Sequence, residues 1–553
     1  MAELPASSDY IIIGGGLAGC VLASRLSQYL PHCSITLLEA GPSPAGNPLV
    51  THPLAVFAAH HSDIDWNYTT VSQRHLNNRT TYAAGGKILS GGTAINYGTW
   101  TRGARVDYDH WAEVVGDEGW GYEGMLKYFK RTERVIGSGK EKEDAHGYEG
   151  NIHVVSVKDS NENRVYPLRE KVRSGWERMG VKYNEDGNGG DPEGIVEVVE
   201  NWREGKRQLA SVAYDLSSVN VVTGVLVKRV IVEKKEGKNI ATGVELADGR
   251  KIVAMKEVIV SAGAYRTPQV LMLSGIGPSA ELEKHGIPSV LEAPEVGKNF
   301  SDHMNCFTFW KLKQPELGLA LGTPLWSDPA FQMGIPADWL ISEHAPDEQV
   351  KSALQADGDV QDQHGLLKSG RCHTESIVAY GPGGFSFIGV NIPLDGTFMS
   401  ATVIGTLPTS RGSITISSGD PAAAPIIDPN FYATESDRVA MRYGMRRIMQ
   451  FFQDTPEGQA MVVEELPPDG FKKLSSDSTD EELDERIQRV GSTIFHPAGS
   501  AMMGKVVDTE LKVMGIQGLR VVDSSIIPVG ICAHYQVPVY ATAEKAADLI
   551  AGR

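Results

Sequence analysis

The stretch DYIIIGGGLAGCVLASRLS, residues 9–27, joins a short apolar run to three spaced glycines and then to a helical pattern. The run at residues 10–13 is typical of a buried parallel strand. After the glycines, Ala18, Leu22 and Leu26 follow at four-residue steps, which places them on one face of a helix. Strand, tight turn and helix in this order predict an α/β fold that opens with a Rossmann-like βαβ unit.

The glycines have the GxGxxG spacing of a phosphate-binding turn, and each has its own physical role. Gly14 permits the tight turn, Gly16 lets backbone approach a pyrophosphate, and Gly19 lets helix and strand pack closely. A second apolar run, SITLLEAG, ends at Glu39, about twenty residues after the turn, where an acid accepts a ribose hydroxyl. The pattern predicts a dinucleotide site at a helix N-terminus and leaves NAD(P) and FAD open, because both carry an ADP half.

Composition narrows the possible functions. The 553 residues carry a formal net charge of −17, so we expect no nucleic-acid partner, because such partners are held through their phosphates. No apolar run approaches the roughly 20 residues of a membrane helix, so we expect no membrane insertion. Few residues precede the first strand-like run, so we expect no secretory signal and a cytoplasmic location. The five cysteines include no CxxC pair, which argues against structural disulfides and zinc.

A second glycine-rich segment, AAGGKILSGGTAINYGTWTRG, covers residues 83–103. It carries no charge between Lys87 and Arg102. Flexible surface loops are usually more polar, so this composition indicates backbone that runs close to a flat ligand.

The middle of the chain is less regular. Residues 130–165 are charge-rich and predict a solvated surface excursion. Residues 311–376 lack periodicity, which is consistent with a long loop or short helices over an active site, or with a surface insert. Strand-like runs at residues 385–431 predict an antiparallel sheet in a second, substrate-covering α+β domain. TESDRVAMRYGMRRIMQFFQ predicts an amphipathic helix at residues 434–453.

Two histidines stand near the C-terminus, each beside a predicted turn. His496 lies in STIFHPAGSAMMG, and His534 follows Asp523, which ends a predicted strand. Histidine titrates nearest to neutrality, so one imidazole can accept a hydroxyl proton while a second bonds the same oxygen. A structural role for either ring stays open. No third ligand stands at a recognisable spacing, so we expect no metal.

Four motifs and their order make the sequence resemble the glucose–methanol–choline (GMC) family of FAD-dependent oxidoreductases, and the aryl-alcohol oxidase-like members in particular. The likeness extends from Asp9 to Ile550. It rests on the N-terminal fingerprint with LLEAG, on GKILSGGTAINYGTW, on GAYRTPQVLMLSGIG, and on HPAGSAMMG with VVDSSIIP and AEKAADLI.

The resemblance implies FAD as the cofactor. Some relatives attach the flavin through a histidine just before the position of Asn96; here that residue is Ile95, so we expect non-covalent FAD. Ser90 and Ser500 depart from the family's usual glycine and threonine, and both are small enough to keep the fold. The implied cofactor-binding residues are Gly14, Gly16, Leu17, Ala18, Gly19, Glu39, Ala40, Gly91, Gly92, Thr93, Asn96, Tyr97, Gly98, Val227, Asp523, Tyr535 and Val537.

The resemblance also implies a discontinuous division of the chain. A Rossmann-like FAD-binding domain would comprise residues 1–155, 205–310 and 485–553. A substrate-binding domain would comprise residues 156–204 and 311–484.

The implied reaction is oxidation of a small alcohol, with hydride transfer to flavin N5. His496 would be the catalytic base and His534 the second active-site residue. Trp310, Phe385 and Phe387 would form apolar walls for a primary aromatic or unsaturated alcohol, such as a secondary metabolite. Oxygen or another acceptor would reoxidise the flavin. A hydroxynitrile lyase of the same family, with FAD but no net redox, stays open as an alternative, as do monomer and homodimer.

Overall fold

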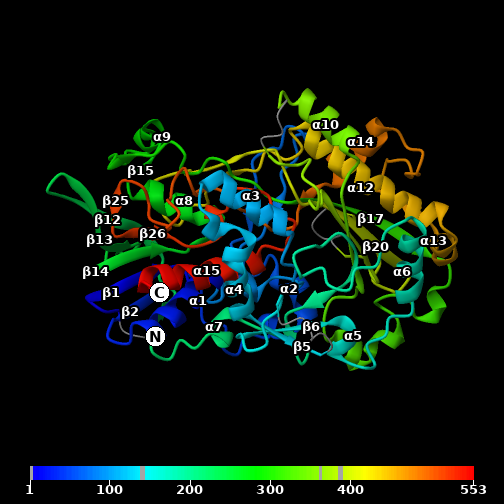
Figure 1. Ribbon diagram of the computed structural model, residues 1–553, viewed down its shortest axis with the longest axis horizontal. Helices are drawn as coiled ribbons and strands as arrows, with labels where there is room; N and C mark the ends of the chain where they lie inside the picture. Colours follow the sequence, from blue (N-terminus) through cyan, green and yellow to red (C-terminus); the bar gives the residue numbers. More distant parts are fainter. Residues whose placement is uncertain (1–3, 138–143, 360–363, 384–389) are drawn as a thin grey trace.

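The computed structural model describes residues 4–137, 144–359, 364–383 and 390–553. Most of its strands belong to two large sheets, one toward each end of the molecule (Figure 1). The first sheet is mixed with a parallel centre, and the second is antiparallel. The predicted α/β fold with an antiparallel second sheet is confirmed.

The first sheet gathers the beginning, the middle and the end of the chain. Its strands are β1 (Ser7–Ile13), β2 (Ile35–Glu39), β11 (Asn220–Thr223), β12 (Val227–Lys235), β13 (Lys238–Leu246), β14 (Lys251–Val260), β25 (Ile516–Gln517) and β26 (Leu519–Val521). β1 is central and pairs in parallel with β2 and β14, while β12, β13 and β14 form an antiparallel meander. β26 adds to β14 in parallel, so the segment that carries Asp523 leaves the sheet beside the first turn.

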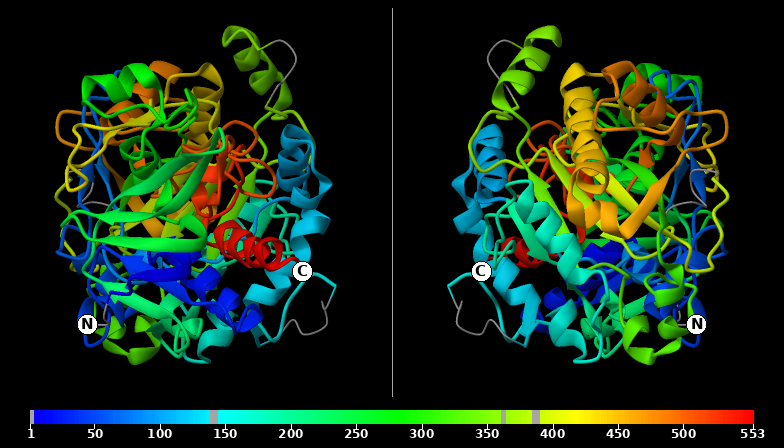
Figure 2. Two further views of the ribbon diagram at one scale, coloured as in Figure 1. Left: turned by 90° about the vertical axis from the view of Figure 1, so that its left-hand side faces the viewer. Right: turned by 90° about the vertical axis from the view of Figure 1, so that its right-hand side faces the viewer.

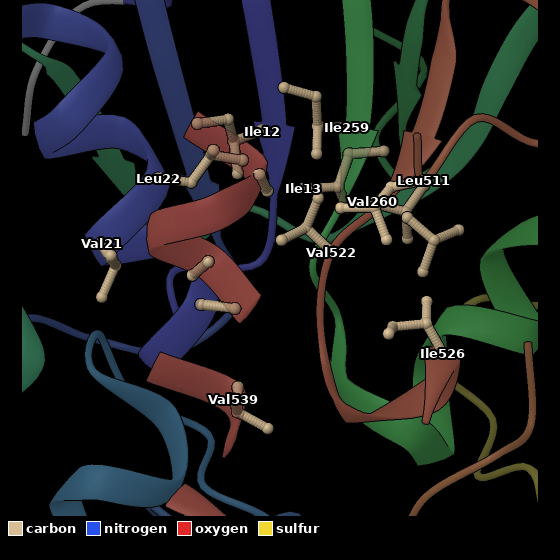
Figure 3. Close-up of a cluster of buried hydrophobic side chains, with 14 of the residues drawn as sticks. Ile12, Ile13, Val21, Leu22, Ile259, Val260, Leu511, Val522, Ile526 and Val539 are labelled. Carbon is tan, nitrogen blue, oxygen red and sulfur yellow. The ribbon is translucent and has the colours of Figure 1, made fainter. Parts of the chain in front are cut away.

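The opening βαβ unit forms as its glycines predict. α1 (Leu17–Tyr29) follows β1 directly and packs closely against the turn. A Cβ atom on Gly19 would lie 2.0 Å from the carbonyl oxygen of Gly14, so only glycine fits. The last helix, α15 (Gln536–Ala551), packs along α1 (Figure 1). The buried cluster in Figure 3 joins Ile12, Leu22 and Val539 from these elements.

The second sheet has the order β23-β17-β20-β19-β18-β7, with β24 beside β17. Its strands are β7 (Gly194–Glu197), β17 (Met304–Leu312), β18 (Trp339–Glu343), β19 (Thr374–Ala379), β20 (Phe398–Gly405), β23 (Val462–Leu466) and β24 (Ser492–Thr493). Because alternate residues of a strand face opposite sides, β17 presents Asn305 and Phe307 to one face and Trp310 to the other.

The helix predicted at residues 434–453 is confirmed as α12 (Glu435–Asp454), which covers the outer face of the second sheet. Trp310 is fully buried beneath it and stacks on Phe452, with 4.2 Å between ring centroids. Residues 311–376 include a short helix, one of the two structures that the sequence allows: α10 (Asp347–Ala356) projects from the body of the molecule (Figure 2). They also contain the strand β18, which the sequence did not predict.

The charge-rich segment at residues 130–165 is only partly at the surface. Its strand β5 (Glu133–Ile136) pairs with β6 (Ile152–Ser156), and Glu133 is buried in an ion pair with Arg102 at 2.6 Å. The prediction of a solvated surface segment is therefore wrong at Glu133. A charged side chain can be buried when an opposite charge pairs with it, as Arg102 does with Glu133.

The expected division into two domains stays a prediction. All of β17 belongs to the second sheet, whereas the expected boundary at residue 310 would cut this strand. In the described ranges, no helix combines the length and the apolar character that crossing a membrane requires.

The tight contact at Gly19 gives a first prediction. Gly19→Ala should lower the melting temperature and the FAD content, because its methyl group would overlap the Gly14 carbonyl. Thermal unfolding and flavin absorbance measure the two effects. Gly419→Ala is the matched control, since the atom nearest to its added Cβ lies 3.7 Å away. Equal melting temperatures and equal FAD contents of the two variants would contradict the close packing at Gly19.

Candidate active site and cofactor cavity

A cavity of about 660 Å³ is lined by the first turn, by the glycine-rich segment, by the inner face of the second sheet and by the C-terminal histidines. The predicted residues that line it are Gly14, Gly16, Leu17, Ala18, Glu39, Ala40, Gly91, Gly92, Thr93, Asn96, Tyr97, Gly98, Val227, His496, Asp523, His534 and Tyr535. The fold therefore brings segments from both ends of the chain to one space.

Not every predicted residue lines this space. Gly19 acts through helix packing, and Val537 is buried in the core cluster to which α1 and α15 both contribute. The prediction for Trp310 is wrong: its position in β17 turns the ring toward α12 and away from the cavity. Phe385 and Phe387 lie outside the described residues.

The nucleotide end of the cavity is built from backbone. α1 begins after Gly16 with no side-chain cap and no acidic residue in its first turn, so its N–H groups stay available to a phosphate. Gly91 crosses this helix start so closely that a Cβ atom on it would lie 2.7 Å from the Cα atom of Gly16. Such a groove of bare backbone suits a pyrophosphate better than any apolar ligand.

Two buried carboxylates flank this groove. Glu39 Oε2 accepts a hydrogen bond from Gly15 N at 2.9 Å, and its Oε1 accepts from Gly41 N at 2.7 Å. Asp523 Oδ2 accepts from Gly263 N at 2.9 Å, at the start of α8 (Gly263–Leu273). Burial raises the pKa of both carboxyl groups, and the backbone N–H donors oppose this shift. The two acids stand where hydroxyls of a dinucleotide can meet them.

The other end of the cavity carries the predicted pair of imidazoles. The rings of His496 and His534 lie 4.9 Å apart between centroids, and Tyr535 stacks on His496 at 5.4 Å. Nε2 of His534 lies 2.8 Å from Oε1 of Glu375, a residue of β19, so the carboxylate fixes the orientation of this ring. The two histidines converge, as the sequence predicts.

Asp302 and His303 complete the site, and the sequence analysis missed them. Asp302 accepts hydrogen bonds from the backbone N–H of His496 at 2.9 Å and from the Thr493 hydroxyl at 2.6 Å. Nδ1 of His303 lies 3.0 Å from Nδ1 of His496. A signal existed: SDHMN places polar residues at alternate positions just before and within an apolar strand, an unusual pattern for a core.

Burial favours the neutral form of two imidazoles in this cluster, those of His496 and His303. Burial lowers the pKa of His496 well below 6.5, and charge on His534 or His303 would lower it further. Burial likewise lowers the pKa of His303 to about 3. Because neutral imidazole has a free lone pair, His496 is ready to accept a proton at neutral pH.

Together, the βαβ unit, the bare backbone groove and the adjacent imidazoles of His496 and His534 define a dinucleotide-dependent oxidoreductase. The chain matches the family models for GMC oxidoreductases at residues 8–305 and 408–543. It belongs to the GMC oxidoreductase family, and its cofactor is FAD.

Relatives and solved structures agree with this assignment. The chain is 42% identical to the GMC-type oxidoreductase acuG of Aspergillus aculeatus, with 98% of each chain covered. It is 32% identical to an alcohol dehydrogenase [acceptor] of Pseudomonas putida, over 98% of this chain and 95% of that protein. A formate oxidase structure from Aspergillus oryzae matches with a TM-score of 0.88 and 28% identity over 99% of both chains.

The buried carboxyl of Asp302 gives a prediction about pH. Burial raises its pKa from 3.8 to about 7, so between these values the folded protein binds more protons than the unfolded chain. Stability from this group is therefore present at acid pH and lost as the pH rises toward 7. Asp302→Asn removes the titration, so its melting temperature relative to the parent should rise between pH 5 and 8, by about 2 °C or more. If the difference in melting temperature between Asp302→Asn and the parent is the same at pH 5 and pH 8, Asp302 does not titrate in this range and the prediction is wrong.

Proposed function

We propose that the chain oxidises a small primary alcohol to the carbonyl compound, with FAD as the hydride acceptor. The observation that carries this proposal is the pair of imidazoles, His496 and His534, on the wall of the cavity that the glycine groove also lines. Alcohol oxidation needs a base for the hydroxyl proton and a partner for the same oxygen, and two adjacent imidazoles supply both.

The chain's own groups would hold the cofactor. The start of α1 and Gly91 would bind the pyrophosphate, Glu39 a ribose hydroxyl, and Asn96 with Asp523 the flavin half. When bound, FAD supplies an isoalloxazine whose N5 accepts hydride. Ile95 lines the cavity where a covalent link would need a nucleophile, so we propose that the FAD is dissociable.

Hydrogen bonding to His303 sets the tautomer of the base. For Nε2 of His496 to accept a proton, its Nδ1 must carry a hydrogen and donate it to Nδ1 of His303. His303 must then carry its own hydrogen on Nε2. That atom makes no hydrogen bond in the described part of the structure. His303 is thus a positioning residue.

The cavity walls support an apolar substrate. The second sheet lines the cavity with Phe307, Ile377 and Ile404, and Leu321 joins them from a neighbouring loop. This lining favours an aromatic or unsaturated alcohol, including a small secondary metabolite, over a free sugar. Relatives named as alcohol and choline dehydrogenases support a CH–OH substrate. Oxygen or another acceptor would then reoxidise the flavin.

Removing the base tests this function. His496→Ala should lower the anaerobic rate of flavin reduction by an alcohol about 10²- to 10⁴-fold, the usual contribution of a general base, while FAD stays bound. Stopped-flow absorbance measures the rate, and His32→Ala, at an exposed position, is the matched control. An unchanged rate would remove His496 from this role. If no alcohol in a broad screen bleaches the flavin of the parent protein, the hydroxynitrile lyase alternative is favoured and the proposed oxidation fails.

The role of His303 can be tested separately from that of His496. His303→Phe keeps a ring but removes the acceptor, so flavin reduction should slow by about tenfold to a hundredfold, as when a catalytic histidine loses its orienting partner. His303→Asn keeps an acceptor near Nδ1 and should recover much of the rate. Both variants should keep the parent's FAD content and its substrate dissociation constant. Equal rates in the two variants would mean that His303 serves packing alone.

A further inference from the structure

The side-chain amide of Asn305, in the cavity wall, has an oxygen that accepts no hydrogen bond from the residues that the structure describes. Asn305 belongs to β17 and is 2% exposed, yet its Oδ1 makes no hydrogen bond with the protein. Leaving a buried polar atom unpaired is unfavourable, so such atoms are rare unless a ligand completes them. Asn305 lines the same cavity as the two catalytic histidines, which makes a ligand the natural partner.

The strand register places this amide close to the reacting groups. His303, Asn305 and Phe307 share one face of the chain, because side chains alternate along a strand. Successive residues on that face are about 6.6 Å apart, so the amide stands one step beyond the imidazole that contacts His496. Across the sheet, Asn305 is paired with Ile404, and Ile404 with Glu375, the partner of His534.

No described side chain beside the amide donates a hydrogen bond to its acceptor oxygen. On the β20 side its neighbours are Phe307 and Ile404, which cannot donate a hydrogen bond to it; on the β24 side it is paired with Ser492, whose hydroxyl makes no hydrogen bond to it. The Thr402 hydroxyl, next along β20, donates instead to the Cys306 carbonyl. Among the described residues that line the cavity from positions 305–404, none is charged. A charged substrate group would therefore meet no counter-ion there, whereas a neutral donor would meet Asn305.

We propose that Asn305 is a substrate-binding residue whose Oδ1 accepts a hydrogen bond from a second donor on the substrate. The substrate class is then a neutral, largely apolar alcohol that carries one further hydroxyl or N–H group away from the reacting carbon. This inference deepens the proposed alcohol oxidation and rests on it for turnover. Binding to the amide is independent of the chemistry and can be measured on its own.

The test uses paired probes on the FAD-loaded protein. The probes are hydroxybenzyl alcohols with the ring hydroxyl in the ortho, meta or para position, each compared with the methylbenzyl alcohol of the same pattern. Methyl and hydroxyl are similar in size, so the pair differs mainly in the donor. The proteins are the parent, Asn305→Leu, which removes the acceptor, and Asn305→Asp, which keeps one. Perturbation of the flavin spectrum gives the dissociation constant, and anaerobic bleaching gives the reduction rate.

For at least one ring position, the parent should bind the hydroxyl probe about tenfold or more tightly than the methyl probe, the worth of one buried hydrogen bond. Asn305→Leu should abolish this preference and leave the methyl probe unchanged, while Asn305→Asp should keep it. Comparing the hydroxyl-to-methyl affinity ratio of the parent with the same ratio in each variant cancels the electronic effect of the ring substituent.

Other outcomes overturn the inference or separate it from the proposed function. An equal effect of Asn305→Leu on both probes would reduce Asn305 to a shape-filling role, and loss of FAD from this variant would assign the amide to the cofactor. If the preference is present and lost in Asn305→Leu, but no alcohol bleaches the flavin, the substrate subsite stands and the proposed oxidation fails.

Discussion

Backbone lies against backbone where the first turn meets the glycine-rich segment, and no side chain fits at that contact. Gly91 crosses the start of α1 at Gly16, while Gly14 and Gly19 close the turn beneath it. This contact forms the floor of the cavity, because the turn that follows β1 and the segment from Gly91 to Gly98 both line it. A floor of bare N–H groups can hold a charged pyrophosphate without a counter-ion from a side chain.

The opposite end of the cavity is governed by burial of polar groups rather than by backbone. His496 is held neutral by its surroundings, and Asp302 anchors its backbone N–H without reaching its ring. A carboxylate on the ring itself would favour imidazolium and reduce its ability to accept a proton. A second neutral imidazole, His303, can orient the ring without adding charge. The pairing of two histidines therefore keeps His496 unprotonated at neutral pH, although it leaves His496 a weaker base than a His–Asp pair would.

The sequence predicted what depends on local spacing and missed what depends on strand register. The glycine turn, α12 and the convergence of His496 with His534 follow from short motifs and from the family resemblance. Trp310 was misplaced because one residue of strand phase decides whether an aromatic ring faces the cavity or α12. Glu375 was missed for a related reason: its partner is 159 residues away, and only the order of strands in the sheet brings them together.

The phase of β17 also has a functional consequence. His303 contacts His496, the proposed base, while Asn305 and Phe307 face the cavity. All three occupy alternate positions of one continuous segment. The segment is held between β20 and β24, so its register cannot slip without moving His303 away from His496. The contact between His303 and His496 therefore fixes the register of β17, whereas a different side chain at position 305 would leave this register unchanged. A family built on this arrangement can alter which substrate it accepts by substitution on this face and leave proton abstraction intact.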